Sequence, residues 1–289
     1  MNYRHHFHAG NFADVFKHVL LLELLRGLQK KEKPFLYLDT HAGRGRYDLE
    51  TAARGDSLER KPEWPDGIGR LVATDEPLTP LLADYVERIR TFDRNQGNVA
   101  DELRFYPGSP HIARSLVRAQ DRLALCEKHP AESAALRAEF QFTDRCSVHE
   151  MDGYVALRAM LPPPERRALV LIDPPFEAQD EFAQIVEGLR GGLQRFPSGV
   201  FAIWYPLTSR AKIDAFYDEL IALKPPPTLA VEIAIAGENS PLKMRGCGLA
   251  VINPPWRFDE AVKPSLESLA RLLAQGPGAD FNLAWAVPE

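Results

Sequence analysis

The sequence predicts an α/β protein in which a central, mostly parallel sheet of about seven strands is flanked by helices, with a helical subdomain inserted near the start. Apolar runs of strand length alternate with helical stretches, as in doubly wound sheets. One run, Ala168 to Ile172, is apolar at every position, which is typical of a strand buried on both faces of a parallel sheet. Finally, Gly45 and Glu127 stand about 80 residues apart, where a plain nucleotide-binding unit needs about 20.

Helical and strand signals follow one another along the chain. Asn11 can cap a helix over Phe12 to Gln29, with Asp14 in its first turn and an apolar stripe along one side. A shorter helix is expected over Tyr154 to Met160. The expected strands are Phe35–Leu38, Leu123–Cys126, Ser147–Glu150, Leu169–Ile172, Val200–Trp204, Leu229–Ala234 and Leu249–Ile252.

The wide spacing after Gly45 divides the chain into three parts. Residues 1–45 hold the N-terminal segment, the first helix and the first core strand. Residues 46–105 contain few β-branched runs and are expected to form the helical insertion. Residues 106–289 complete the core.

Composition places the chain among soluble enzymes. Its 45% apolar content suffices for a large core, and its net charge of −5 argues against a protein that simply coats nucleic acid. No run is long and apolar enough for export or membrane insertion, so the expected location is the cytoplasm. Three scattered cysteines and the clustered N-terminal histidines lack metal-ligand spacing, so no metal is expected. The first 33 residues are locally basic, which suits either phosphate contacts or a solvated face.

The segment Asp173-Pro174-Pro175-Phe176 carries the strongest chemical signal. The two prolines end the preceding strand abruptly at the carboxyl edge of the sheet, where open α/β sheets bind ligands. There the Asp173 carboxylate, the Pro174 carbonyl and the Phe176 ring suit a flat heterocycle with an exocyclic amine. A near copy, Asn253 to Trp256, follows the strand expected to be last and peripheral, so Asp173 is the preferred catalytic residue.

Weaker signals occur at the ends of other expected strands. Gly43 and Gly45 form a turn that lets a ligand approach the backbone, and Glu127 can hold ribose hydroxyls. Asp152 with Gly153 can bind an adenine amino group or merely cap a helix, and Ser109 before Pro110 has the form of a helix N-cap. Their order along the chain is the layout of a Rossmann-like class I S-adenosylmethionine-dependent methyltransferase that acts on an amino nitrogen.

Several segments resemble the bacterial ribosomal RNA large subunit methyltransferase J family, and the resemblance runs from end to end. The matching motifs are Tyr3-Arg4-His5, Phe7-His8-Ala9-Gly10-Asn11, Ala13-Asp14-Val15, Lys17-His18, Leu38-Asp39-Thr40-His41-Ala42-Gly43, Tyr106-Pro107-Gly108-Ser109-Pro110, Glu127 with His129-Pro130, Trp204-Tyr205-Pro206, Ile252-Asn253-Pro254-Pro255-Trp256 and Val287-Pro288-Glu289.

The resemblance implies methylation of the 6-amino group of one adenine in 23S rRNA, on naked or early-assembly RNA. S-adenosylmethionine would be the donor and S-adenosylhomocysteine the product. The implied donor-site residues are His18, His41, Ser109, Glu127, Asp152, Gly153 and Asp173. Tyr3 would contact the RNA, with Lys17 as a second contact, and the target base would flip against Phe176. Related enzymes often have tyrosine at that position, so this chain keeps the ring but lacks the hydroxyl.

Two other functions share part of this pattern. A DNA adenine-N6 methyltransferase would use the same core chemistry, although the compact insertion leaves no room for a separate target-recognition domain. A non-catalytic nucleic-acid or nucleotide-binding module is the other alternative. A monomer is expected, and the sequence assigns no role to Arg44 or to the second motif, Asn253–Trp256.

Overall fold

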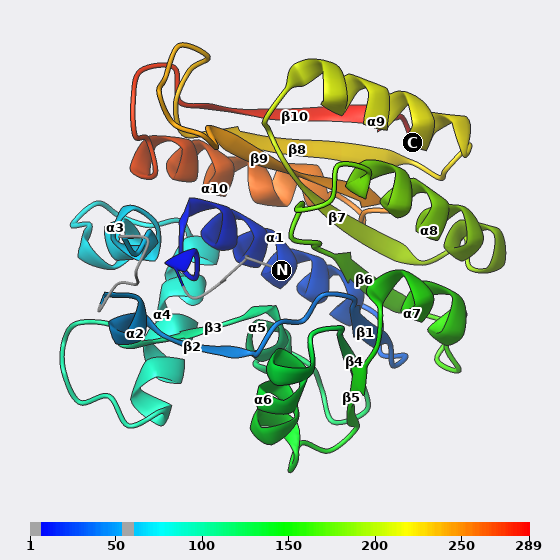
Figure 1. The fold of residues 1–289 in the computed structure, drawn as a ribbon, viewed down its shortest axis with the longest axis horizontal. Helices are drawn as coiled ribbons and strands as arrows, with labels where there is room; N and C mark the ends of the chain where they lie inside the picture. Colours follow the sequence, from blue (N-terminus) through cyan, green and yellow to red (C-terminus); the bar gives the residue numbers. More distant parts are fainter. Residues whose placement is uncertain (1–6, 54–60) are drawn as a thin grey trace.

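The computed structural model describes residues 7–53 and 61–289, and its centre is one mixed sheet of eight strands (Figure 1). The strands of this sheet are β1 (Leu36–Asp39), β4 (Arg122–Glu127), β5 (Cys146–Glu150), β6 (Ala168–Ile172), β7 (Val200–Pro206), β8 (Thr228–Ala234), β9 (Gly246–Ile252) and β10 (Asp280–Val287). The helices that pack on it are α1 (Phe12–Gln29), α5 (Ser109–Arg114), α6 (Pro130–Phe140), α7 (Gly153–Met160), α8 (Glu181–Arg195), α9 (Arg210–Ala222) and α10 (Phe258–Leu272).

The strand order is β10-β8-β9-β7-β6-β1-β4-β5. From β5 to β7 all neighbours are parallel, whereas β9, β8 and β10 each pair antiparallel with their neighbours. The predicted Rossmann-like, mostly parallel sheet is therefore confirmed, with β10 as an additional strand. The segment Phe281, Leu283, Trp285 and Val287 has the period-two alternation that could have identified it.

Two separate apolar clusters cover the two faces of the sheet. One contains the buried side chains of α1, α5 and α10, and the other contains those of α7, α8 and α9. Strand β6 contributes to both, since Leu169 and Leu171 belong to the first cluster and Val170 and Ile172 to the second. All five of its residues are buried, as the unbroken apolar run predicted.

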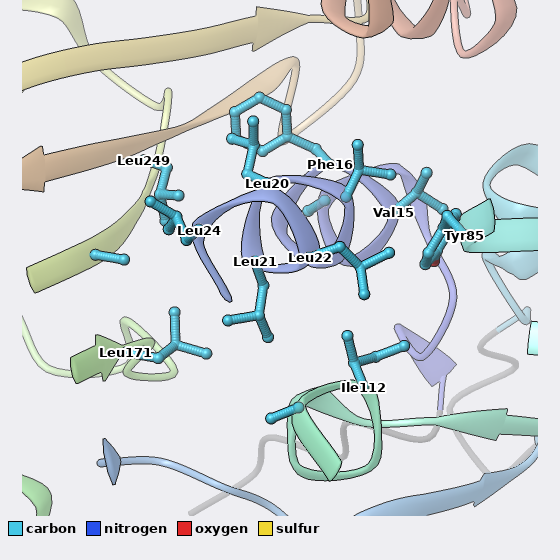
Figure 2. Packing of buried hydrophobic residues seen from close by; sticks show 14 of the residues in the cluster. Val15, Phe16, Leu20, Leu21, Leu22, Leu24, Tyr85, Ile112, Leu171 and Leu249 are labelled. Carbon is cyan, nitrogen blue, oxygen red and sulfur yellow. The ribbon is translucent and has the colours of Figure 1, made fainter. Parts of the chain in front are cut away.

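Helix α1 begins and ends where the sequence predicts, and the Asn11 side chain accepts a hydrogen bond from the Asp14 amide. The sequence predicted that only one side of this helix would be buried. In the structure every residue from Phe12 to Leu22 is buried, so the first three turns are enclosed on all sides. Figure 2 shows Leu171 of β6, Leu249 of β9, Ile112 of α5 and Tyr85 placed around the helix. Polar residues of α1 therefore lie inside the protein, where each needs a partner.

The insertion is helical, as predicted, except at its base. It contains α2 (Leu49–Ala53), the 3₁₀ helix η2 (Trp64–Asp66), α3 (Ile68–Ala73) and α4 (Pro80–Asn95). Its two ends pair as a short antiparallel ribbon formed by β2 (Arg46–Asp48) and β3 (Phe105–Pro107). Strands of three residues carry too little pattern to be recognised in the sequence. In the described part of the chain, no helix is long and apolar enough to cross a membrane.

The second Pro-Pro motif lies at the opposite edge of the sheet from Asp173. Because β9 runs antiparallel to β7, its last residue, Ile252, pairs with Phe201 near the start of β7. The preference for Asp173 is consistent with this arrangement, but the expected reason was wrong: β9 is neither the last strand nor peripheral, since it lies between β7 and β8. The two motifs lie at opposite edges because β6 and β9 run in opposite directions.

The contact between α1 and this second motif gives a stability prediction. A Cβ atom added at Gly27 would lie 2.4 Å from Cβ of Pro255, so Gly27→Ala should destabilise the protein by ~1–3 kcal/mol through overpacking. Gly191 is the matched control, because it also lies inside a helix and an added Cβ would meet only Cγ of Arg158, at 3.8 Å. Gly191→Ala should be neutral or stabilising by up to ~1 kcal/mol. Urea unfolding measures both changes, and equal effects would contradict the close contact.

Candidate active site at the carboxyl edge of the sheet

The acidic residues predicted to share one edge of the sheet are brought together by the strand register. Strand β1 pairs in parallel with β4 and β6, and Asp39 aligns with Leu125 and Leu171. Strand β5 continues the parallel set, with Glu150 opposite Glu127. The carboxyl ends of β1, β4, β5 and β6 therefore face the same side, which is where open α/β sheets bind ligands.

Asp39 is the hub of this edge, and the sequence analysis did not single it out. It is fully buried, and its Oδ2 accepts hydrogen bonds from the Tyr37 hydroxyl at 2.8 Å and from the Ser109 hydroxyl at 2.7 Å. Its Oδ1 accepts from the His41 amide at 3.3 Å. Burial raises the pKa of the Asp39 carboxyl to about 6, although the hydrogen bonds oppose that shift. Its position as the first residue of the Asp-x-x-x-Gly-x-Gly turn was the available signal.

Ser109 does not cap helix α5. The N-cap is Gly108, which has no side-chain hydrogen bond, and Ser109 is the first helical residue. Because the hydroxyl of Ser109 instead donates to Asp39, the side chain is held at the carboxyl edge of β1. The capping interpretation was wrong, and the donor-site role that the family resemblance implies for Ser109 stays a prediction.

The glycine turn and Glu127 are joined directly. The amide of Gly43 donates to Oε2 of Glu127 at 2.9 Å, and the amide of His129 donates to Oε1 at 2.7 Å. Gly43 has φ +60, and an added Cβ would lie 2.5 Å from the Tyr47 hydroxyl, so the turn requires glycine there. Burial raises the pKa of the Glu127 carboxyl. Each carboxylate oxygen keeps a lone pair for a further donor.

Arg44, between the two glycines, pairs with helix α6 through two hydrogen bonds to Glu132, at 2.9 and 2.8 Å. This bidentate ion pair gives Arg44 a structural role at the turn.

The start of helix α7 packs tightly against the loop after β1. Asp152 is the N-cap and accepts from the Tyr154 amide at 2.9 Å, while its Oδ2 pairs with Lys128 at 2.9 Å. An added Cβ at Gly153 would lie 2.4 Å from the carbonyl oxygen of Thr40 and 2.9 Å from the ring of His41. Glycine therefore allows the cap of α7 to approach His41. The capping interpretation of Asp152 is confirmed, and its contact with the adenine of a donor stays a prediction.

His41 lies half-buried between these elements. A ring nitrogen lies 2.8 Å from the Thr40 hydroxyl, and the ring meets Tyr154 edge-on at a centroid distance of 5.4 Å. Burial lowers the pKa of His41 to about 4. The imidazole is therefore neutral at neutral pH and can both donate and accept a hydrogen bond.

Asp173 forms an ion pair with Lys17, which projects from α1. The ammonium lies 2.6 Å from Oδ2 of Asp173 and 2.8 Å from Oδ1 of Asp14, and Lys17 is only 5% exposed. Burial acts to lower the pKa of Lys17, but the two carboxylates outweigh it and raise that pKa well above its ordinary value. Lys17 is thus a fixed cation behind Asp173 and does not lie on the surface where a direct RNA contact was expected.

Phe176 presents an aromatic ring next to Asp173. Its backbone has φ +51, an uncommon conformation for a large residue. The ring packs edge-on against Phe182 and Trp204, at centroid distances of 5.0 and 5.7 Å. Two aromatic neighbours therefore support a half-buried ring at the end of β6.

His18, a predicted donor-site residue, is buried away from solvent. His18 is 1% exposed, and a ring nitrogen lies 2.9 Å from the Tyr106 hydroxyl, which in turn lies 2.7 Å from that of Tyr85. It therefore supports the segment leading to Ser109 and has almost no surface for a ligand. Tyr3 lies outside the described residues. Within residues 7–53 and 61–289 no group of three or more His, Cys, Asp or Glu side chains could hold a metal ion.

The raised pKa of Asp39 predicts a pH dependence of stability. Between pH 3.8 and about 6 the folded protein holds a proton that the unfolded chain has released, so the contribution of Asp39 to stability falls as pH rises through this window. The free energy of unfolding of the wild type, minus that of Asp39→Asn, should therefore decrease from pH 4 to pH 6.5, by ~3 kcal/mol at most. Urea unfolding at several pH values measures it, and parallel curves would contradict it.

Comparison with known proteins agrees with this geometry. Residues 32–287 match the family described as "Ribosomal RNA large subunit methyltransferase D, RlmJ". Ribosomal RNA large subunit methyltransferase J of Escherichia coli is 40% identical over the full length of both chains, and so is that of Haemophilus influenzae. A crystal structure of a Legionella pneumophila protein superposes with a TM-score of 0.83 at 36% identity, covering 96% of this chain and 97% of the other.

The matched region contains the glycine turn, Glu127, Asp152 and the Asp173 motif, which the fold places along one edge of the sheet. The chain therefore belongs to the RlmJ family of ribosomal RNA large subunit methyltransferases.

Proposed function

We propose that the protein transfers a methyl group from S-adenosylmethionine to the 6-amino group of an adenine in 23S rRNA, acting as a cytoplasmic monomer on naked or early-assembly RNA. The observation that carries the proposal is the end of β6. There a carboxylate with a fixed counter-ion, a main-chain carbonyl and a supported aromatic ring follow one another in Asp173, Pro174 and Phe176. These groups match the two hydrogens and the flat ring of an aminopurine.

The donor would lie across the ends of β1, β4 and β5, and the residues present fit it. Glu127, held by two backbone amides, can accept from the two ribose hydroxyls, and Asp152 with Gly153 suits the adenine. Ser109, fixed by Asp39, and neutral His41 lie toward Asp173 and suit the amino-acid part. When bound, S-adenosylmethionine supplies an electrophilic methyl group on a sulfonium.

The base would leave its stack and lie against Phe176, at a cost of a few kcal/mol that is lower in a loop. One amino hydrogen would be accepted by Asp173 and the other by the Pro174 carbonyl, which directs the nitrogen lone pair out of the ring. As the carbon–nitrogen bond forms, the carbon–sulfur bond breaks, and the amino group gives its surplus proton to Asp173 or to water. The ion pair with Lys17 holds the Asp173 carboxylate in place, so that positioning supplies much of the rate enhancement.

RNA is proposed as the substrate because of the family to which the chain belongs, and not because of the catalytic motif. A DNA adenine methyltransferase would need the same groups at the end of β6. The relatives matched over their full length are named for ribosomal RNA, and the insertion of residues 46–105 is small, which together favour RNA. Tyr3 and the basic N-terminal segment remain the proposed contacts with that RNA.

Replacement of the proposed acceptor tests the function. Asp173→Asn keeps the shape of the side chain but removes its charge, so methyl transfer to 23S rRNA should fall at least ~100-fold. Binding of S-adenosylmethionine should remain measurable by calorimetry. Trp256→Ala, in the copy of the motif at the opposite edge, is the control and should leave transfer near the wild-type rate. Wild-type turnover in Asp173→Asn would overturn the assignment.

A second prediction separates the role of Lys17 at the site from its role in folding. Lys17→Met leaves Asp14 and Asp173 without their buried counter-ion, so the free energy of unfolding should fall by ~3–5 kcal/mol. The rate of methyl transfer should fall as well. Adding Asp14→Asn removes one of the two carboxylates and should recover part of the stability, measured by urea unfolding. Methyl transfer should stay low in the double variant. If it returned together with stability, Lys17 would be a structural residue only.

A further inference from the structure

At the edge of the sheet opposite the proposed active site, the structure brings together two segments that methyl transfer does not use. Strands β9 and β10 both run antiparallel to the direction of β6, so their carboxyl ends meet at this edge. Trp256 of the second Pro-Pro motif and Pro288 of the C-terminal segment line one cleft there, with a volume of about 470 Å³.

The cleft has an aromatic lining that is open to solvent. Trp256 is 72% exposed, and Trp285 of β10 lines the same cleft and is half-buried. So exposed a tryptophan is uncommon, since the ring has a large apolar surface. Two exposed or half-exposed indole rings on one cleft suit a ligand that packs on aromatic faces.

The backbone around Trp256 is fixed, so the ring is presented in a defined place. The Asn253 side chain donates to the carbonyls of Pro197 and Gly199, at 2.6 and 2.9 Å. Pro255 packs against Gly27 of α1. Asn253 and Arg257 both have positive φ, at 54° and 59°, so the chain turns sharply on either side of the Pro-Pro-Trp segment.

The charge of the cleft is negative. Three carboxylates line it, those of Asp259, Glu260 and Glu289, against one guanidinium, that of Arg257. Arg257 pairs with Glu260 and is therefore already compensated. A positively charged ligand would be attracted both by these carboxylates and by the faces of the tryptophan rings, whereas the phosphates of RNA would be repelled by the carboxylates.

Strand β10 adds a main-chain surface beside the cleft. It is the last strand of the sheet and pairs with β8 alone, and no strand of the described chain covers its outer side (Figure 1). The main-chain N–H and C=O groups on the outer side of such a last strand can form hydrogen bonds with an added extended segment. A second copy of this chain is disfavoured as the occupant, because a two-fold contact here would bring like charges together.

We propose that this cleft binds an extended basic peptide segment of a partner protein. The segment would pair its main chain with the outer side of β10 and place a Lys or Arg side chain between Trp256 and the carboxylates of Asp259 and Glu289. Such a site would hold the protein to a basic partner from the side of the molecule opposite the RNA.

Indole NMR of the full-length protein labelled with ¹⁵N-tryptophan tests the proposal. The probe is the peptide acetyl-Ala-Lys-Ala-Lys-Ala-amide, with the same peptide carrying Glu for Lys and a single-stranded oligoadenylate as comparisons. The Lys peptide should shift the indole signals of Trp256 and Trp285 but not those of Trp64 and Trp204. Trp256→Ala and Asp259→Asn should weaken its binding about 10-fold and several-fold.

Three results would overturn the proposal: no shift with the Lys peptide at millimolar concentration, equal binding of the Glu peptide, or preferential binding of the oligoadenylate at these signals. Circular dichroism and thermal unfolding show that each variant is folded. Methyl transfer by Trp256→Ala is measured in parallel, so that failure of the peptide site and failure of the proposed methyltransferase function are distinguished.

Discussion

The buried ion pair between Lys17 and Asp173 links the packing of the fold to its chemistry. Because α1 is enclosed by the sheet, α5, α10 and the insertion, Lys17 is buried and its charge must be compensated within the protein. Asp14 supplies one negative charge from the same helix, and Asp173 supplies the other from the end of β6. The N-terminal helix thereby fixes the position of the carboxylate on which the proposed reaction depends.

The other groups of the edge depend on comparable close contacts. Asp39 holds Ser109, the glycine turn holds Glu127, and Gly153 allows α7 to approach His41. Each uses main-chain geometry or a buried hydrogen bond, so the site is assembled before any ligand arrives. Such preorganisation suits methyl transfer, in which the donor is already reactive and alignment governs the rate.

Much of this arrangement could be predicted from the sequence because its signals are local. The apolar run of β6, the Asn11 cap and the strand-end carboxylates each depend on a few adjacent residues. The features that could not be predicted are contacts between segments far apart in the sequence. The hydroxyl of Ser109 meets Asp39 across 70 positions, and Lys17 meets Asp173 across 156, so neither partner could be read from spacing. The direction of β9 likewise depends on its pairing with β7, so the physical difference between Asp173 and Asn253, which follow strands of opposite direction, could not be predicted from the sequence.

The identity of the methylated atom tests the central claim most directly. Full-length 23S rRNA transcribed without modification is incubated with the protein and S-adenosylmethionine carrying a labelled methyl group, and is then digested to nucleosides for mass spectrometry. We expect the label in N6-methyladenosine, because the proposed mechanism has Asp173 and the Pro174 carbonyl accept the hydrogens of an exocyclic amino group. Label in a ring-nitrogen or carbon methylation product, or in the ribose, would contradict it.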